Sequence, residues 1–224
     1  MALLIHHLHV SQSERLLWLC EELGIPYTIK CYDRAPLLAP PEYKALHPQG
    51  TSPVIQHGDI TLAESGACVE YICHRLASEE QRSPLIVHPD ALEYPDFLYW
   101  WHWVNGSFQP TLGRSMAARG AVDENNPMQV IAKDRLQRAL NGLNDRLAEN
   151  EWLGGGQFTL ADIMIVFPLT TMRYFFPYSL HEYVNIVRYL ERVGRREAYQ
   201  RAMKRGDPQM GLVLGADPPK KAMM

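Results

Sequence analysis

Residues 47–65 read HPQGTSPVIQHGDITLAES, and this stretch organises our interpretation of the whole chain. Residues 54–55 and 60–62 are short apolar runs on either side of a Gly-Asp turn, which is the pattern of a β-hairpin. Pro53 opens the first run, where a missing N–H group is tolerated. After Leu62 the apolar residues recur at helical spacing, so a helix is expected to begin near Glu64 and Ser65.

The chemistry of this corner suits the head group of an amino acid. A helix N-terminus presents unpaired N–H groups and a partial positive charge, both of which favour a carboxylate. Ser65 adds a hydroxyl donor there, and Glu64 beside it can pair with an ammonium group. A cis Ser52–Pro53 bond would turn the backbone of Ser52 outward, where an extended peptide can pair with it. The alternative interpretation is a hairpin with a trans proline, followed by an ordinary capped helix.

Four stretches resemble the cytosolic glutathione transferases. Residues 50–54 (GTSPV) and 62–65 (LAES) resemble the glutathione-binding half of that family. Residues 8–23 (LHVSQSERLLWLCEEL) are similar to its first strand, catalytic turn and first helix. Residues 101–112 (WHWVNGSFQPTL) resemble the fourth helix of a fungal and bacterial branch, and residues 158–162 (FTLAD) resemble the capping motif of the helical domain. The resemblance implies an α/β N-terminal thioredoxin-like domain, an all-α C-terminal helical domain and a homodimer.

The pattern along the chain gives the expected domain limits. Residues 1–78 form the thioredoxin-like glutathione-binding domain, and the polar residues 79–91, with two prolines, form a linker. Residues 92–206 carry only helical patterns, and residues 207–224 are expected to be a poorly ordered tail. Besides the hairpin, strands are expected at 2–10 and 27–32, and helices at 11–22, 64–76, 94–116, 128–149, 160–173, 180–193 and 195–204.

Composition and charge limit the partners and the location. A net charge of −3 and a pI near 6.3 give no reason to expect a nucleic acid or an anionic membrane. No apolar run approaches the ~18 residues that span a bilayer. The N-terminus lacks a basic region followed by a long apolar segment, so a cytoplasmic location is expected.

The cysteines and the N-terminal histidines give no sign of redox or metal chemistry. Four cysteines, at positions 20, 31, 68 and 73, show no C-x-x-C motif, and we expect inert thiols. His6 and His7 point to opposite faces of a strand, and no cysteine or carboxylate with ligand spacing accompanies them or His9. No metal site is therefore predicted.

The catalytic hydroxyl is expected at the head of the first helix. A cysteine thiol with a pKa near ~8.5 is only partly ionised at neutral pH, and a hydroxyl donor or a helix N-terminus stabilises its anion. By resemblance to the serine-type transferases, the catalytic hydroxyl lies four residues before an arginine, here Arg15, which selects Ser11. Ser13 is the second candidate. The alternative is that both serines only cap the helix.

The resemblance also assigns the glutathione-binding residues. Glu64 and Ser65 would hold the γ-glutamyl end, and Ser52, before Pro53, would pair its backbone with the cysteine of glutathione. Thr51 stands where relatives often carry a lysine, so the partner of the glycyl carboxylate is left open between two nearby residues, Lys44 and His47.

The electrophile is expected to bind between the two domains. Val10 and the helix that follows the linker would line this pocket, with Trp101, Asn105, Phe108 and Leu112 as the candidates. Relatives often carry an acidic residue where Asn105 stands, so the role of Asn105 is open.

These residues predict a glutathione S-transferase, an enzyme of detoxification. Glutathione would be its co-substrate, and its thiolate would attack a small hydrophobic electrophile or, as a peroxidase side activity, an organic hydroperoxide. A glutathione-dependent isomerase or dehalogenase would use the same thiolate site. The alternative is a non-catalytic regulatory protein that binds glutathione or a hydrophobic ligand. A hydroxyl at the head of the first helix favours catalysis.

Overall fold

A computed structural model describes residues 2–119 and 126–223 of the chain; the expected domain ranges extend outside the described residues at 1, 120–125 and 224. The described residues form two compact units. The first contains the chain up to residue 86 together with residues 193–212, and the second contains residues 87–192 and 213–222. No helix among the described residues is long and apolar enough to cross a membrane.

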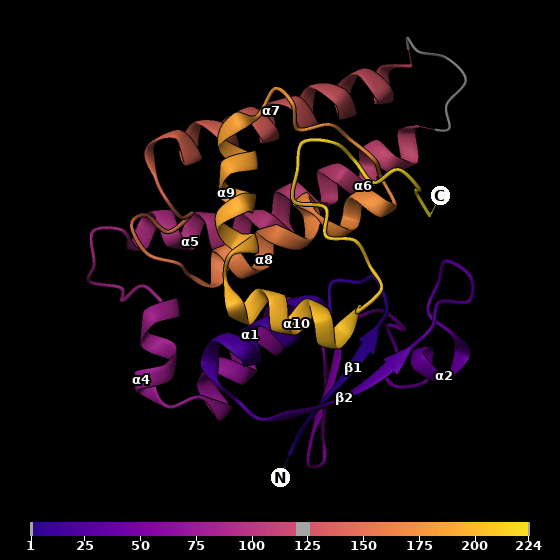
Figure 1. Cartoon of the computed structure of the whole chain (residues 1–224), viewed down its shortest axis with the longest axis vertical. Coiled ribbons are helices and arrows are strands. Elements are labelled where there is room, and N and C mark those ends of the chain that lie inside the picture. Colours follow the sequence, from indigo (N-terminus) through magenta and orange to yellow (C-terminus); the bar gives the residue numbers. More distant parts are fainter. Residues whose placement is uncertain (1, 120–125, 224) are drawn as a thin grey trace. The chain divides into compact units, whose positions relative to one another are not determined.

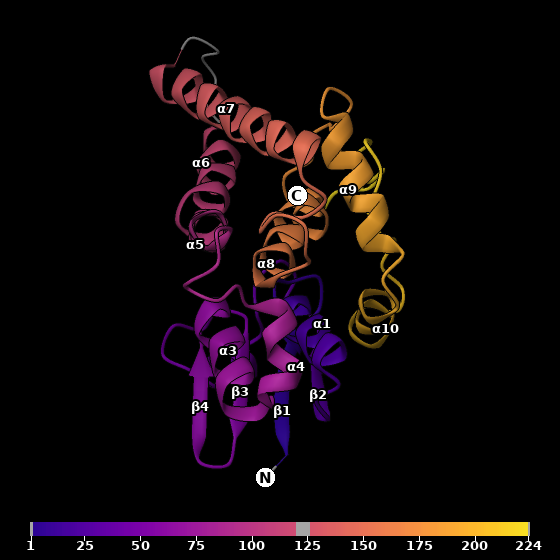
Figure 2. The same ribbon diagram turned by 90° about the vertical axis from the view of Figure 1, so that its left-hand side faces the viewer.

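The first unit is a mixed α/β, thioredoxin-like domain built on a four-stranded sheet of order β2-β1-β3-β4. β1 pairs in parallel with β2 and antiparallel with β3, and β3 and β4 form the expected hairpin. Gly58 makes the turn of this hairpin with a φ of 61°, a conformation that glycine adopts without strain. Figure 2 shows the strands side by side, next to helices of this unit. The strands are β1 (Leu3–Leu8), β2 (Tyr27–Tyr32), β3 (Val54–His57) and β4 (Ile60–Ala63).

The helices predicted from residues 11, 64 and 195 are present and begin within three residues of those positions. Gly24 ends α1 in the left-handed conformation, as its place before Pro26 indicates. The predicted helix from residue 64 is α3, which continues as a π-helical turn. The predicted linker contains a short helix, capped reciprocally by Ser78 and Gln81. The helical segments are α1 (Glu14–Leu23), α2 (Pro41–Lys44), α3 (Ser65–Tyr71), the turn Ile72–Leu76, α4 (Glu79–Arg82), a 3₁₀ turn (Ser83–Leu85) and α10 (Glu197–Gly206).

α10 comes from the far end of the sequence and packs against α1 in the first unit (Figure 1). The Trp18 and Tyr199 rings meet edge to face, with centroids 5.0 Å apart. At the rim of this contact Arg196 pairs with Glu22 at 2.7 Å. The limits predicted from sequence follow the chain and place α10 in the helical domain; those limits stay a prediction, whereas the contacts group α10 with the first unit.

The second unit is all helical, as expected. The predicted helix 94–116 is continuous but contains a π-helical segment, and the almost wholly apolar α8 is buried along its entire length, which confirms it as the core of this unit. The segments are α5 (Tyr94–Trp103), the π segment Val104–Phe108, α6 (Gln109–Ala118), α7 (Pro127–Glu149), α8 (Leu160–Leu169), a 3₁₀ turn (Thr171–Tyr174) and α9 (Val184–Gly194), which ends at the boundary with the first unit.

The capping box predicted at the start of α8 is present. The Asp162 carboxylate accepts hydrogen bonds from the backbone and hydroxyl of Thr159, from the N–H of Leu153 and from the Tyr189 hydroxyl. Burial raises the pKa of Asp162 to about 6, against these hydrogen bonds, so the group is ionised at pH 7.5. One buried carboxylate therefore fixes the start of α8, the preceding loop and α9.

Asp162→Ala is expected to lower the free energy of unfolding by about 2–4 kcal/mol, because it removes a helix cap and leaves buried donors unsatisfied. Urea unfolding at pH 7.5 measures the change. The matched control is Asp145→Ala on the exposed side of α7, which should change stability by less than about 0.5 kcal/mol. Equal stability of the two variants would contradict the structural role of Asp162.

Candidate active site

The corner around Ser52 meets the turn between β1 and α1. The Ser52–Pro53 peptide is cis. The Ser52 hydroxyl lies 2.8 Å from the Ser11 hydroxyl, and the Gln12 side-chain amide donates to the Ser52 carbonyl at 2.9 Å. Two hydrogen bonds thereby join residues that are 41 and 40 positions apart in sequence. Val10, in the same turn, has a φ of 54°, a strained value for a β-branched residue that redirects the chain from the strand into the helix.

The two candidate serines have different surroundings. Ser11 contacts Ser52 on one side and Ser13 on the other, where the two hydroxyl oxygens are 2.8 Å apart. Ser13 is fully buried, and its hydroxyl lies 2.8 Å from Nδ1 of His7. The geometry therefore places Ser11, and not Ser13, next to the Ser52–Pro53 corner.

Ser13 occupies the predicted N-cap position of α1, but neither serine caps the helix with its side chain. Ser13 has a helical backbone conformation and makes no side-chain capping bond. The Ser11 hydroxyl accepts from the backbone N–H of Ser13 at 3.3 Å, which lies before the first helical residue, Glu14. The physical reason is geometry: the backbone angles of Ser13 are helical instead of the extended ones that a side-chain cap requires, and its hydroxyl lies beside His7.

Behind Ser13 the hydrogen bonds continue to Asp207. Nε2 of His7 lies 3.1 Å from one carboxylate oxygen of Asp207, and Nδ1 of His9 lies 2.8 Å from the other. The Val10 N–H also donates to this carboxylate. The expectation of a poorly ordered tail after Gly206 is thus wrong at its first residue, because Asp207 is buried and tied to β1.

The predicted absence of a metal site stays a prediction. The structure brings His7 and His9 together with Asp207, with donor atoms within 4.8 Å of one another. Sequence spacing could not show this cluster, because its carboxylate lies about 200 residues away. Both ring nitrogens that face Asp207 are at hydrogen-bond distance from its oxygens, so a cation would have to displace their protons.

The corner formed by Glu64 and Ser65 is where the γ-glutamyl end of glutathione is expected. It contains a buried cation that the sequence did not assign to it. Ser65 begins α3 and is buried, while Glu64 before it is exposed with a φ of 71°. The Arg15 guanidinium donates to the Ser65 hydroxyl at 3.2 Å and to Oε1 of Gln12 at 2.7 Å. Burial lowers the pKa of Arg15 to about 9, against the attraction of Glu14, so the group remains cationic at neutral pH. The signal in the sequence was the spacing of Gln12 and Arg15, three residues apart.

Of the two candidates for the glycyl end, Lys44 packs against Gly50, the residue before the exposed Thr51. Gly50, with a φ of 61°, lies against the Lys44 stem so closely that an added Cβ would be 3.3 Å from its Cγ. His47 is half-buried, and its Nδ1 accepts from the Gln49 N–H at 3.3 Å. Lys44 is exposed, so its ammonium group can reach a ligand beside Thr51.

The residues expected to line the electrophile pocket lie in different units. Val10 is half-buried in the first unit, whereas the other candidates belong to the second. There Trp101, Phe108 and Leu112 are buried, and Asn105 is exposed. Their common role in a pocket stays a prediction.

Three of the cysteines are buried as expected, and burial raises the pKa of Cys68 and Cys73 to about 12 and that of Cys20 further. These three thiols are protonated at neutral pH, which agrees with the expectation that they are inert. Cys31 is an exposed residue, but its sulfur is partly buried. This partial burial, together with the negative charges of Asp207 and Asp33, also raises the pKa of its thiol.

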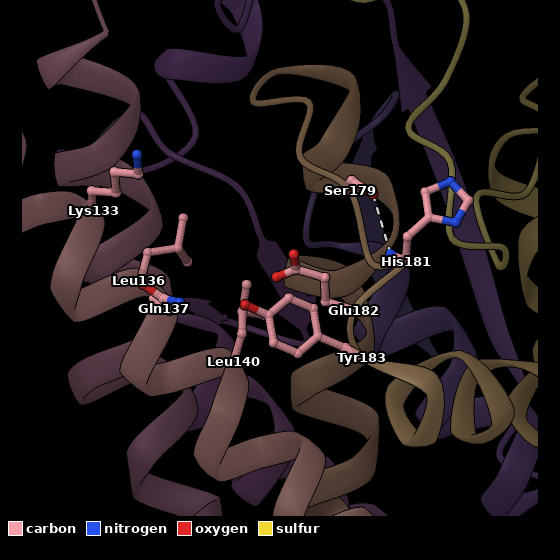
Figure 3. A pocket seen from close by; sticks show the side chains of 8 residues that line it. All are labelled: Lys133, Leu136, Gln137, Leu140, Ser179, His181, Glu182 and Tyr183. Atoms are coloured by element: carbon pink, nitrogen blue, oxygen red, sulfur yellow. Dashed lines mark hydrogen bonds between the residues drawn. The ribbon is translucent and has the colours of Figure 1, made fainter. Parts of the chain in front are cut away.

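A cavity of about 420 Å³ lies in the second unit, between α7 and the segment before α9 (Figure 3). None of the site residues predicted from the sequence lines it. Its lining residues are Lys133, Leu136, Gln137, Leu140, Ser179, His181, Glu182 and Tyr183.

The first unit is thioredoxin-like with a cis-proline corner, and the second unit is all helical. Together they define a two-domain protein of the thioredoxin-like plus all-helical class. The family model "Glutathione S-transferase, N-terminal domain" matches residues 11–75, and "Glutathione S-transferase, C-terminal domain" matches residues 95–197. The chain is similar to "Glutathione S-transferase 3" of Schizosaccharomyces pombe, with 30% identity over 212 residues that cover 88% of this chain and 84% of the relative. The chain belongs to the glutathione S-transferase family.

Solved structures agree with this assignment. A glutathione S-transferase from Actinobacillus pleuropneumoniae superposes with a TM-score of 0.82 and 28% identity, covering 95% of this chain and 98% of that one. A theta class glutathione S-transferase from Xanthomonas axonopodis pv. citri, described with glutathione bound, has a TM-score of 0.64 and 25% identity, covering 90% and 96%.

Proposed function

We propose that this protein is a glutathione transferase that ionises the thiol of bound glutathione beside Ser11, for attack on a small hydrophobic electrophile. The observation that carries the proposal is the position of the Ser11 hydroxyl, 2.8 Å from Ser52 at the junction of β1 and α1. A hydroxyl donor next to sulfur favours the thiolate over the thiol. Family membership and the named transferases among its relatives support this activity.

Glutathione would bind along the corner in an extended form. Its γ-glutamyl carboxylate would take the hydroxyl and N–H groups at the start of α3, beside the buried cation of Arg15, and its ammonium would face the exposed carboxylate of Glu64. The cysteine would pair with the backbone of Ser52 as an added strand. This orientation places its sulfur next to Ser11.

The remaining expectations belong to the same proposal. We infer a cytoplasmic homodimer that acts in detoxification, with glutathione as its co-substrate and reduction of organic hydroperoxides as a side activity. The non-catalytic alternative has the same fold and binds glutathione or a hydrophobic ligand without turnover.

The experiment that tests the proposal is capture on immobilised glutathione, followed by a conjugation assay with a nitro-activated aryl chloride and a peroxidase assay with an organic hydroperoxide. Capture with turnover supports the proposal. Capture without turnover on any member of a panel of electrophiles would favour the non-catalytic alternative. Failure of capture would contradict the transferase and leave only a protein that binds a hydrophobic ligand.

Lys44→Met is expected to raise KM for glutathione about 2- to 5-fold with little change in kcat. The reason is that an exposed ion pair contributes at most about 1 kcal/mol. Initial rates at varied glutathione concentration measure the change, and Lys44→Arg is the control that keeps the charge. A larger rise in His47→Ala than in Lys44→Met would transfer the glycyl carboxylate to His47.

A further inference from the structure

The hydrogen bonds that meet at Asp207 fix the position of one proton on His7. A carboxylate can only accept hydrogen bonds. Asp207 accepts from the N–H of Val10 and from one ring nitrogen each of His7 and His9. Although burial opposes ionisation, the hydrogen bonds from His7, His9 and the Val10 N–H hold the pKa of Asp207 below its ordinary value. In the neutral form of the His7 ring, the contact with the Asp207 carboxylate puts the proton on Nε2 and leaves Nδ1 as an acceptor.

This tautomer sets the direction of the hydrogen bonds that join the three serines to His7. Nδ1 of His7 lies 2.8 Å from the Ser13 hydroxyl, so Ser13 donates to it. The 2.8 Å contact between Ser13 and Ser11 then needs the proton of Ser11, and the contact between Ser11 and Ser52 needs the proton of Ser52. All three hydroxyl groups therefore donate inward, toward His7.

The C-terminal end of α10 packs closely against the side chain of His7. A Cβ added to Gly206 would stand 2.7 Å from Cδ1 of Leu17 and 3.0 Å from Nε2 of His7, so only glycine allows this approach. The next residue is Asp207. The close packing of Gly206 against Leu17 and His7 therefore positions the Asp207 carboxylate at His7, and a larger side chain at Gly206 would prevent this packing.

We propose that His7, held by Asp207, takes up the proton of the glutathione thiol through Ser13 and Ser11. The inference rests on the proposed function, because it needs the sulfur to lie beside Ser11 on the side that Ser52 now occupies. His7 and Asp207 act through the serines and are positioning residues.

The step balances without any other reactant. The S–H bond breaks and its proton goes to Oγ of Ser11; the proton of Ser11 passes to Oγ of Ser13; the proton of Ser13 passes to Nδ1 of His7. The products are a thiolate and an imidazolium, and both serines remain neutral. The Asp207 carboxylate balances the imidazolium charge, as a buried acid does for a catalytic histidine in serine hydrolases.

The same shift supplies the donor that the thiolate needs. After it, His7 donates to Ser13, Ser13 donates to Ser11, and the Ser11 hydroxyl points at the sulfur. Formation of the anion and of its stabilising hydrogen bond is therefore one movement of protons over contacts of 2.8 Å each.

Among the described residues, further charged groups near His7 and His9 lie on neighbouring segments of the first unit. Arg34, after β2, opposes an imidazolium, but its guanidinium donates to the carbonyls of His9 and Val10. Asp33 faces the far nitrogen of His9 at 3.9 Å and is 99% exposed. Cys31 is the β2 neighbour of His7 in the sheet. Asp207 is the buried anion in contact with His7, so it is the group that decides where the proton stays.

The test is an ultraviolet titration of the bound thiolate in the wild-type protein and in Asp207→Asn and His7→Asn. In both variants the midpoint of thiolate formation should move up by about one pH unit, and kcat/KM near neutral pH should fall about tenfold. In mixtures of light and heavy water the wild-type rate should depend non-linearly on the deuterium fraction, as expected for several protons in transit, and this curvature should disappear in His7→Asn. Asp33→Asn is the matched control and should titrate like the wild type.

A second ligand separates proton transfer from structure. S-methylglutathione has no thiol proton, so the wild type and both variants should bind it with Kd values within about twofold. Loss of that binding in both variants, or an unchanged thiolate titration in both, overturns the inference. A wild type that shows no bound thiolate and no turnover refutes the proposed function instead.

Discussion

Ser11→Ala is expected to lower kcat/KM for glutathione conjugation by about 100- to 1000-fold, with KM for glutathione changed by less than about threefold. Removal of one preorganised donor at a developing anion costs about that much in enzymes. Ser11 is buried, so water does not readily replace the lost hydroxyl. Initial rates with a nitro-activated aryl chloride, at several glutathione concentrations, measure both constants.

Two neighbouring serines provide the controls. Ser52→Ala removes a hydroxyl from the same corner and should reduce kcat/KM by less than about fivefold, because the ligand's sulfur replaces that contact. Ser13→Ala should fall between the two variants, since the Ser11 hydroxyl remains while its contact to His7 is cut. Wild-type turnover in Ser11→Ala, together with a large loss in Ser13→Ala, would assign the sulfur contact to Ser13.

The parts of the fold that could be predicted are those that local chemistry determines. The Gly-Asp turn between two short apolar runs gives the β3–β4 hairpin, and Gly24 before Pro26 ends α1. Thr159 and Asp162 mark the start of α8 three residues apart. In each case the residues that decide the structure lie within a few positions of one another, so the sequence alone contains the interaction.

What could not be predicted depends on residues far apart in the chain. α10 has an amphipathic pattern that fits either unit, and only its contact with Trp18 and the glutamates of α1 decides its place. Asp207 follows it in a segment rich in turn-forming residues, which resembles a tail. Nothing near Asp207 in sequence indicates that His7 and His9 would be its partners.

The candidate site was predictable as a set of positions but not as a network. The motif and the resemblance identify the two serines and the residues of the Ser52–Pro53 corner. They assign no role to Gln12, and they use Arg15 only to select Ser11. Both residues bond across the site: Gln12 to the Ser52 carbonyl, and Arg15 to Ser65. A buried arginine beside a predicted carboxylate site becomes informative only when its neighbours are known.

Arg15→Met is therefore expected to raise KM for glutathione about 10- to 100-fold while kcat changes by less than about threefold. Arg15 is fully buried and donates to the Ser65 hydroxyl, which would hold the γ-glutamyl carboxylate. A hydrogen bond or charge that supports a bound anion is worth about 1.5–3 kcal/mol. The remote γ-glutamyl end takes no part in bond breaking, so the loss should fall on binding and not on the chemical step.

Methionine keeps the volume of the side chain, but the buried Glu14 carboxylate loses the cation that attracts it. Removing one partner of a buried pair costs about 3–5 kcal/mol, so Arg15→Met should be less stable in urea, and KM is measured at a temperature at which the variant is folded. Arg15→Lys, which keeps a charge but loses the planar fork, should show an intermediate KM. Arg173 is an equally buried arginine whose guanidinium bonds to backbone carbonyls in the second unit, so Arg173→Met should lose stability and leave KM for glutathione unchanged. An unchanged KM for glutathione in Arg15→Met would contradict this prediction. Arg15 would then stabilise the fold, as Arg173 does, and would not support glutathione binding.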